Sequence, residues 1–256
     1  MINPTLFIVW AAVFGAMIGS FLNVCIYRVP RKLSIAHPPS ACPSCGRRLA
    51  WFENLPIVGW LALRGCCRTC HAAIRPRYVI IEALTAAMFA GAAWYYGETV
   101  IFWSRATLGS VLIVLFAIDL EHQLLPNVIT LPFILVGFAF SFFVEPGWRS
   151  SLIGILVGGG SLLAMFYLWL WLRKQEALGM GDPKMLAMIG AFLGWKLTIL
   201  TLVLASFSGS IVGLGLIVTR RARMQTLIPF GCFLAFGAAI AAVVGQPLMD
   251  WYLSFF

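Results

Sequence analysis

The sequence predicts an all-α, polytopic membrane protein with about eight transmembrane helices and a small cysteine-rich cytoplasmic insertion between the first two. Three observations lead to this fold class. The 256-residue chain is 61% hydrophobic and only 11% charged, which is more apolar than a soluble domain requires. Its apolar residues form long runs separated by polar loops. Four of its seven cysteines form two CxxC pairs within one loop.

Each long apolar run is expected to form one membrane-spanning helix. The first run precedes the nearest basic residues instead of following them, so we expect a membrane helix and not a typical cleavable signal peptide. The sixth run is short and is expected to form a tight hairpin with the seventh. The predicted spans are Leu6–Ile26, Tyr78–Tyr96, Val100–Ile118, Val128–Val144, Ser151–Leu172, Pro183–Gly194, Leu197–Thr219 and Ile228–Val244.

Basic residues set the predicted orientation, with the N-terminus outside and four loops in the cytoplasm. These loops are 27–77, 119–127, 173–182 and 220–227; with Lys184 beside the third, they contain fifteen of the eighteen Lys and Arg residues. The net charge of +9 is therefore explained by topology and by attraction to anionic lipid headgroups. No nucleic-acid partner is expected.

The composition divides the chain into three expected regions. Residues 1–27 form the first transmembrane helix, and residues 28–77 form a small cytoplasmic domain rich in Cys, Pro, Arg and Gly. Residues 78–256 form the transmembrane core. No internal repeat or low-complexity tract is present.

The cytoplasmic loop is expected to hold a structural zinc ion, as in a zinc ribbon. Two CxxC pairs separated by 21 residues can supply four thiolates in the tetrahedral arrangement that Zn²⁺ prefers. Gly46 leaves room for the turn after the first pair. A loop this short has almost no hydrophobic core, so the metal would stabilise it. The predicted ligands are Cys42, Cys45, Cys67 and Cys70.

Disulfides or free thiols are the alternatives to a zinc site, and disulfides are disfavoured in a reducing cytosol. Cys66 adjoins the second pair, but only its neighbour completes CxxC. His37 and His71 are possible substitute ligands, although a lone histidine near such a pair is more often a bystander. Cys25 and Cys232 lie in apolar runs and are expected to be packing residues.

Two aspartates are the candidate catalytic residues. Asp119 lies in AIDLEHQLLPN and Asp182 in GMGDPKM, each where a long apolar run meets a short polar loop. An ionisable residue at a membrane segment is costly to desolvate and usually functional. If the two carboxyl groups lie at hydrogen-bonding distance they share a proton, so one can act as general base while the other polarises a carbonyl group.

Each aspartate also has a structural explanation. Asp182 precedes Pro183 at the start of an apolar run, a pattern typical of a helix N-cap followed by proline. Gly179 and Gly181 would still allow a substrate strand to approach this acid closely. Asp119 ends its run, where the helix dipole disfavours negative charge, so a purely structural role is harder to assign to it.

The sequence resembles the type IV prepilin peptidases, also called leader peptidases, over nearly its whole length. The similar segments occur in the same order and their combination is specific. They are GSFLNVCIYRVP (19–30), CPSC (42–45), LAWFENLPIVGWLALRGCCRTC (49–70), RPRYVIIEALTA (75–86), IDLEHQLLPN (118–127), GMGDPKM (179–185), GAFLGW (190–195) and IPFGCFLA (228–235).

This resemblance implies an aspartic membrane protease of the GxGD kind. Such enzymes remove a short basic leader from type IV prepilins or type II secretion pseudopilins at the cytoplasmic face. Many then methylate the new N-terminal amine with S-adenosyl-L-methionine. By motif, Asp119 and Asp182 correspond to the catalytic pair, and the four paired cysteines to a site associated with bifunctional members. Glu82 is expected to help bind the cationic amine or the methyl donor, and Lys184 matches the lysine after GxGD.

Four positions depart from the pattern of this family without removing a catalytic residue. Asn127 stands where Asp is frequent, and Pro183 replaces a more usual apolar residue. Cys66 replaces a common Arg, and Cys232 a common Pro. These departures put fine geometry and substrate preference in question.

The expected setting is the inner (cytoplasmic) membrane of a bacterium, with a multi-pass chain in the lipid bilayer and the active site facing the cytoplasm. The apolar helix of a pilin substrate could dock beside Gly154, Gly158 and Gly159, although small residues equally often pack helices together. Three alternatives stay open: a peptidase without methyltransferase activity, a cation-coupled transporter that uses both aspartates, and an assembly subunit that docks through its cysteine loop.

Overall fold

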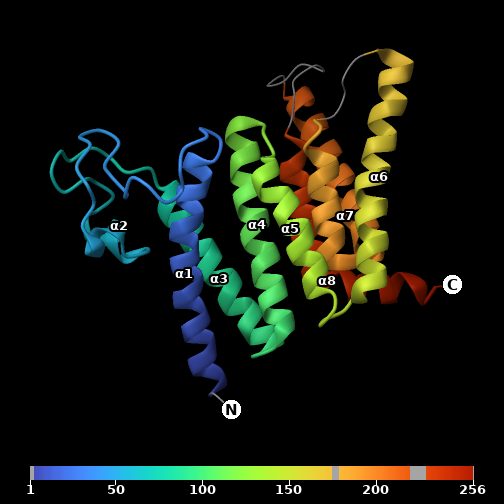
Figure 1. Cartoon of the computed structure of the whole chain (residues 1–256), viewed down its shortest axis with the longest axis horizontal. Coiled ribbons are helices and arrows are strands. Elements are labelled where there is room, and N and C mark those ends of the chain that lie inside the picture. The colour runs from blue at the N-terminus through green and yellow to red at the C-terminus, as the bar shows by residue number, and fades with distance from the viewer. Residues whose placement is uncertain (1–2, 175–178, 220–228, 256) are drawn as a thin grey trace. The chain divides into compact units, whose positions relative to one another are not determined.

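The computed structural model describes residues 3–174, 179–219 and 229–255, and within these ranges every regular element is a helix (Figure 1). The predicted all-α polytopic class is confirmed. The elements are α1 (Pro4–Arg28), the 3₁₀ helix η1 (Trp51–Asn54), α2 (Val58–Ala62), α3 (Arg77–Tyr96), α4 (Val100–His122), α5 (Asn127–Phe140), α6 (Gly147–Arg173), α7 (Asp182–Val218) and α8 (Phe230–Leu253).

Among the described residues, six helices are long and apolar enough to cross a membrane: α1, α3, α4, α6, α7 and α8. The shorter apolar helix α5 ends at Phe140, four residues before the predicted end of its span. The eight predicted spans correspond to these seven helices, because the sixth and seventh ranges both lie in α7. The predicted basic loop 220–227 and residues 175–178 of loop 173–182 lie outside the described residues.

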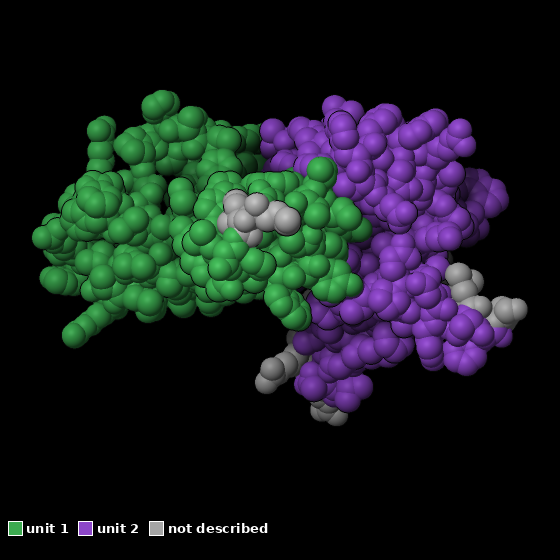
Figure 2. Space-filling view, turned by 90° about the horizontal axis from the view of Figure 1, so that it is seen from below, with its two compact units in different colours: residues 1–114 green, residues 115–256 purple. Residues whose placement is uncertain are grey.

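The chain divides into two compact units, residues 1–114 and 115–256, which Figure 2 colours separately. This boundary falls within α4. The three-region division expected from composition (1–27, 28–77 and 78–256) stays a prediction.

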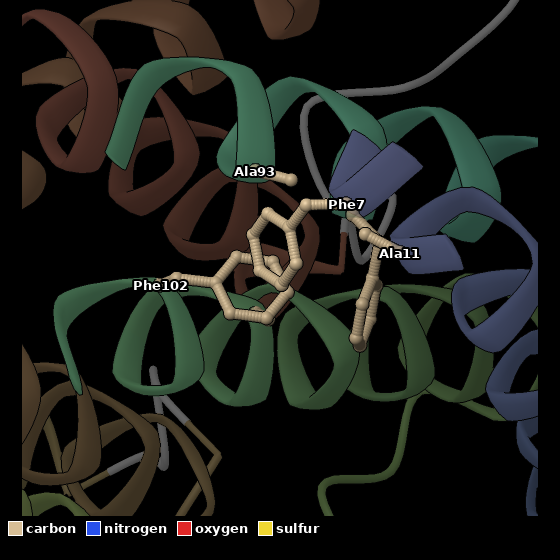
Figure 3. Close-up of a cluster of buried hydrophobic side chains, with 6 residues drawn as sticks. Phe7, Ala11, Ala93 and Phe102 are labelled. Carbon is tan, nitrogen blue, oxygen red and sulfur yellow. The ribbon is translucent and has the colours of Figure 1, made fainter. Parts of the chain in front are cut away.

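In the first unit, α1 packs against α3 along an apolar and aromatic contact. Figure 3 shows Phe7 and Ala11 of α1 beside Ala93 of α3 and Phe102 of α4. The rings of Phe7 and Phe102 meet edge to face with centroids 5.2 Å apart, a favourable aromatic geometry. The cysteine-rich loop emerges between the ends of these two packed helices.

In the second unit, α7 packs against α5, α6 and α8 and has a sharp reversal at Gly194. Gly194 has φ 74° and ψ 171°, which is open to glycine and strained for other residues. A Cβ added to Gly158 of α6 would lie 2.6 Å from the Leu186 carbonyl oxygen and 3.1 Å from Thr198 Cγ2. In a continuous helix these two residues would be about 18 Å apart. The limbs 182–193 and 195–218 therefore run side by side, as the predicted hairpin requires.

Small residues of α6 form the contact with this hairpin. A Cβ added to Gly154 would lie 2.5 Å from the Gly190 carbonyl oxygen, so the two helix backbones touch at this point. Gly158 approaches the backbone at Leu186 in the same way. Of the two explanations that the sequence left open for these glycines, helix packing is the one that the structure uses.

We predict that Gly154→Ala destabilises the protein by about 1–3 kcal/mol, because the added methyl group overpacks a contact between two backbones. Gly160→Ala is the matched control on the same helix, since a Cβ there meets nothing within 4 Å. The measurement is thermal unfolding of both variants in detergent. Equal melting temperatures for the two variants would contradict the close packing of α6 on α7.

Candidate active site and cysteine cluster

Asp119 lies in the last turn of α4 and is only 4% exposed. Its Oδ2 accepts a hydrogen bond of 3.0 Å from the backbone N–H of Cys232, and the N–H of Gly231 also faces this carboxylate. Both N–H groups belong to the first turn of α8, whose free amides and dipole stabilise negative charge. The start of α8 therefore binds this acid, a contact that the sequence analysis missed. The only available signal was the segment IPFGCFLA, which contains both residues.

Asp182 is the first residue of α7 and is 7% exposed. The N-cap position is Gly181, and the cap carries no side-chain hydrogen bond, so the capping role considered for Asp182 is not the one observed. The backbone N–H of Gly179 faces its carboxylate, which also interacts electrostatically with Asp119.

Leu125 connects the surroundings of the two aspartates. A Cβ added to Gly181 would lie 2.6 Å from the Cβ of Leu125. A Cβ added to Gly231 would lie 3.1 Å from the Cδ1 of the same leucine and 2.7 Å from Asp119 Oδ2. The glycine beside Asp182 and the glycine beside Asp119 thus both pack on one leucine, which brings two acids 63 positions apart in the sequence into one site.

Lys184 lies on the first turn of α7, and its Nζ donates a hydrogen bond of 2.8 Å to Asn127 Oδ1. This contact links the starts of α5 and α7 next to Asp182. The supporting role predicted for Lys184 is therefore compatible with its position. Gly179 contributes a backbone donor, and Gly181 provides close packing.

Glu82 belongs to the first unit and is buried on α3. Its Oε2 accepts a hydrogen bond of 2.7 Å from the backbone N–H of Ile57, the residue before α2. The carboxylate thus holds the cysteine-rich loop against α3. The predicted role of Glu82 in binding an amine or a methyl donor stays a prediction.

The four predicted cysteine ligands form one cluster, with all sulfur atoms within 4.8 Å of one another. The Sγ atoms of Cys42 and Cys70 are 3.8 Å apart. A tetrahedral site with zinc–sulfur bonds of about 2.3 Å has edges of about 3.8 Å, so the donor set fits Zn²⁺. Residues 28–77 also contain the two isolated β-bridges of the described chain, one beside each CxxC pair.

The two CxxC turns have the same backbone hydrogen bonds. The backbone N–H of Cys42 donates to the carbonyl of Arg47, and the carbonyl of Cys42 accepts from the N–H of Gly46. In the same way, the N–H of Cys67 donates to the carbonyl of Ala72, and the carbonyl of Cys67 accepts from the N–H of His71. Gly46 and His71 both have positive φ, of 70° and 54°. His71 therefore occupies the turn position equivalent to Gly46, which explains why it is not part of the cluster.

The thiols of this cluster differ in acidity, because desolvation and hydrogen bonds with the other three thiols raise the pKa of Cys70 to about 11 while that of Cys67 is lowered. Backbone N–H groups of Cys70 and Thr69 lower the pKa of the Cys67 thiol to about 6, so it is largely a thiolate at neutral pH. Arg47 donates to both oxygens of Glu53 at 2.7 and 2.9 Å, which lowers the pKa of that carboxyl group. Glu53 is buried and Arg47 is half-buried, and this pair fixes the chain between the two cysteine turns.

Comparison with known sequences agrees with this arrangement. Residues 13–96 match the family described as Bacterial Peptidase A24 N-terminal domain, and residues 106–214 match the Type IV leader peptidase family. The chain is 34% identical to the prepilin leader peptidase/N-methyltransferase of Pseudomonas aeruginosa, over 99% of this chain and 96% of the relative. The chain belongs to the type IV leader peptidase family.

Other members of the family are similarly close to this chain. The prepilin leader peptidase/N-methyltransferase of Myxococcus xanthus is 43% identical over 86% of this chain and 67% of its own length. The protein of the same description from Aeromonas hydrophila is 35% identical over 99% of this chain and 96% of its own. No solved structure matches the chain.

We predict that the purified protein binds about one Zn²⁺ per chain and that Cys67→Ser removes it, because three thiolates leave the tetrahedron incomplete. Cys66→Ser is the matched control, since it alters the adjacent thiol outside the cluster. Metal content is measured by atomic emission on protein in detergent. Equal zinc content in the two variants would contradict this ligand assignment.

Proposed function

We propose that this chain is a membrane aspartic endopeptidase that removes the basic leader from type IV prepilins or type II secretion pseudopilins. After cleavage, it uses S-adenosyl-L-methionine to methylate the new N-terminal amine. The proposal transfers to this chain the activity named for its relatives in Pseudomonas, Myxococcus and Aeromonas.

The observation that carries the proposal is the meeting of two buried aspartates in an apolar helix bundle. Asp119 and Asp182 are the only described aspartates or glutamates of residues 115–256 that are buried. They interact electrostatically, although they come from different helices. Their location at helix ends, and not in mid-helix, argues for a site at the membrane surface and against a transporter with acids near mid-membrane.

The proposed reaction needs one ionised and one protonated carboxyl group. The ionised group removes a proton from water as the water attacks the scissile carbonyl carbon, while the protonated group donates a hydrogen bond to the carbonyl oxygen. Collapse of the tetrahedral intermediate breaks the carbon–nitrogen bond, and the leaving amine takes up a proton. Because two neighbouring carboxyl groups exchange protons as a unit, the pair is assigned these roles jointly.

The proposed second reaction transfers a methyl group from the sulfonium of S-adenosyl-L-methionine to the amine nitrogen, which then loses a proton. The cysteine cluster is assigned a structural role in this activity, with zinc bound by Cys42, Cys45, Cys67 and Cys70. We assign no residue to the methyl donor, because the chain has no G-x-G-x-x-G segment between a strand and a helix.

The distribution of basic residues among the loops supports a proposed site at the cytoplasmic face of the inner membrane. Both aspartates adjoin loops predicted to be cytoplasmic, 119–127 and 173–182. A prepilin consists of a basic leader followed by an apolar helix held in the membrane. Its scissile bond would therefore lie at the level of the aspartates.

We predict that Asp119→Ala and Asp182→Ala each lower the cleavage rate by at least about 10²-fold, the usual contribution of a general acid or base. The assay combines purified protein, a prepilin-like substrate and S-adenosyl-L-methionine, and reads leader loss and methyl addition by intact mass. Asp250→Ala, which alters an exposed aspartate on α8, is the control.

The same assay separates the proposed function from its alternatives. Cleavage that survives either replacement would refute the aspartate pair. Cleavage without methyl addition would identify a peptidase only. We expect the Cys67→Ser/Cys70→Ser double variant to lose methyl addition, in keeping with the association of these cysteines with bifunctional members.

We also predict that Gly231→Ala impairs cleavage while leaving both aspartates in place. The added methyl group would lie 2.7 Å from Asp119 Oδ2 and would displace the carboxylate from the amides of α8. Gly215→Ala on α7 is the control, because a Cβ there has open space. The measurement is the cleavage rate of both variants at matched thermal stability, and equal rates would show that the position of the Asp119 carboxylate is not critical.

A further inference from the structure

An exposed apolar face runs along η1 and α2 of the cysteine-rich loop. Trp51 is 79% exposed, Val58 61% and Leu61 59%, and Leu55 and Phe52 are also exposed. The opposite side of the same segment is buried at Glu53 and Gly59, where the two backbones touch. The segment therefore has one buried side, which contains Glu53, and one exposed side, which carries the apolar side chains.

Two contacts determine how far along α1 and α3 this exposed face lies. Glu82 binds the Ile57 N–H from a position five residues inside α3, which is about 7.5 Å from the start of that helix. A Cβ added to Gly19 would lie 2.8 Å from the Cα of Glu82, and Gly19 is nine residues, or about 13 Å, inside the end of α1. The start of α2 is thus held beside these helices and not beyond their ends, as Figure 1 also shows.

Basic side chains accompany the apolar face. Residues 28–77 contain nine Lys or Arg and a single acidic residue, Glu53, which Arg47 already neutralises. Arg48, Arg64 and Arg68 are exposed. The guanidinium carbon of Arg68 lies 5.6 Å from the ring centroid of Phe52, so positive charge borders the apolar side chains directly.

We propose that the η1–α2 face, defined as Trp51, Phe52, Leu55, Val58 and Leu61, is a membrane-interface anchor. It lies at the boundary of headgroups and acyl chains in the bilayer that α1 and α3 cross, and the exposed arginines bind anionic headgroups. Aromatic and aliphatic side chains bordered by arginine are the composition of segments that bury about 5–10 Å into this boundary. A water-exposed face of this kind would be unfavourable at the level that Glu82 and Gly19 set.

The anchor gives the cysteine-rich loop a function beyond metal binding. Both ends of the loop continue into apolar helices, and the anchor adds a third attachment between them. The cysteine cluster is thereby held at the membrane surface in one orientation. Arginine near an anionic surface attracts lipid headgroups within about one Debye length, so the attachment depends on lipid charge.

The test uses the full chain in nanodiscs of phosphatidylcholine with phosphatidylglycerol, with a photoreactive benzophenone amino acid at Val58 or, separately, at Leu61. The same probe at Ser44, an exposed residue in the first cysteine turn, is the control. Zinc content establishes that each variant retains its fold. We expect lipid adducts at Val58 and Leu61 to exceed those at Ser44 by about fivefold or more, since only the former lie among acyl chains.

The arginines are tested in the same nanodiscs. Adding phosphatidylglycerol should raise lipid adducts at Leu61 in the otherwise unchanged chain, and Arg64→Gln/Arg68→Gln should abolish that rise. Adducts at Val58 and Leu61 that form with protein instead of lipid, or that do not exceed those at Ser44, would overturn the anchor. A rise that persists in the double arginine variant would overturn the headgroup contact.

Discussion

A carboxylate enclosed by apolar helices needs hydrogen-bond donors that lipid cannot supply, and this need determines the local structure of the second unit. Asp119 meets it with the amides at the start of α8, and the amide of Gly179 faces the carboxylate of Asp182. Among the residues that the structure describes, the polar groups that face the two acids are backbone amides and not cationic side chains. The hydrogen bond of Asp119 joins the end of α4 to the start of α8, and Leu125 packs on Gly181 before α7 and on Gly231 of α8.

The features that the sequence predicts well are those that depend on side-chain type at fixed spacing. Apolar runs locate the membrane helices because the bilayer sets their minimum length. CxxC spacing identifies Cys42, Cys45, Cys67 and Cys70 because a tetrahedral ion accepts few arrangements of thiolates. Gly194, at the junction of two predicted spans, permits the reversal between them because only glycine adopts its backbone angles without strain.

The contacts that the sequence does not predict are those in which one partner is backbone. Every residue except proline has the same backbone N–H donor. The amino-acid sequence therefore does not identify Ile57 as the partner of Glu82 or Cys232 as the partner of Asp119. Cys232 illustrates the difficulty. It was expected to be a packing residue, and its side chain is buried, yet its amide is what binds the candidate catalytic acid.

The hairpin of α7 also makes the position of the candidate site independent of the thickness of the membrane. Its first limb, 182–193, is only about 18 Å long, well short of the hydrocarbon layer of about 30 Å. Nearly all of its residues are buried by protein, so lipid does not set its length. The depth of Asp182 is instead fixed by packing of Gly190 and Leu186 on α6. Hydrophobic mismatch would tilt or strain the outer helices while leaving the position of this carboxyl group within the bundle unchanged.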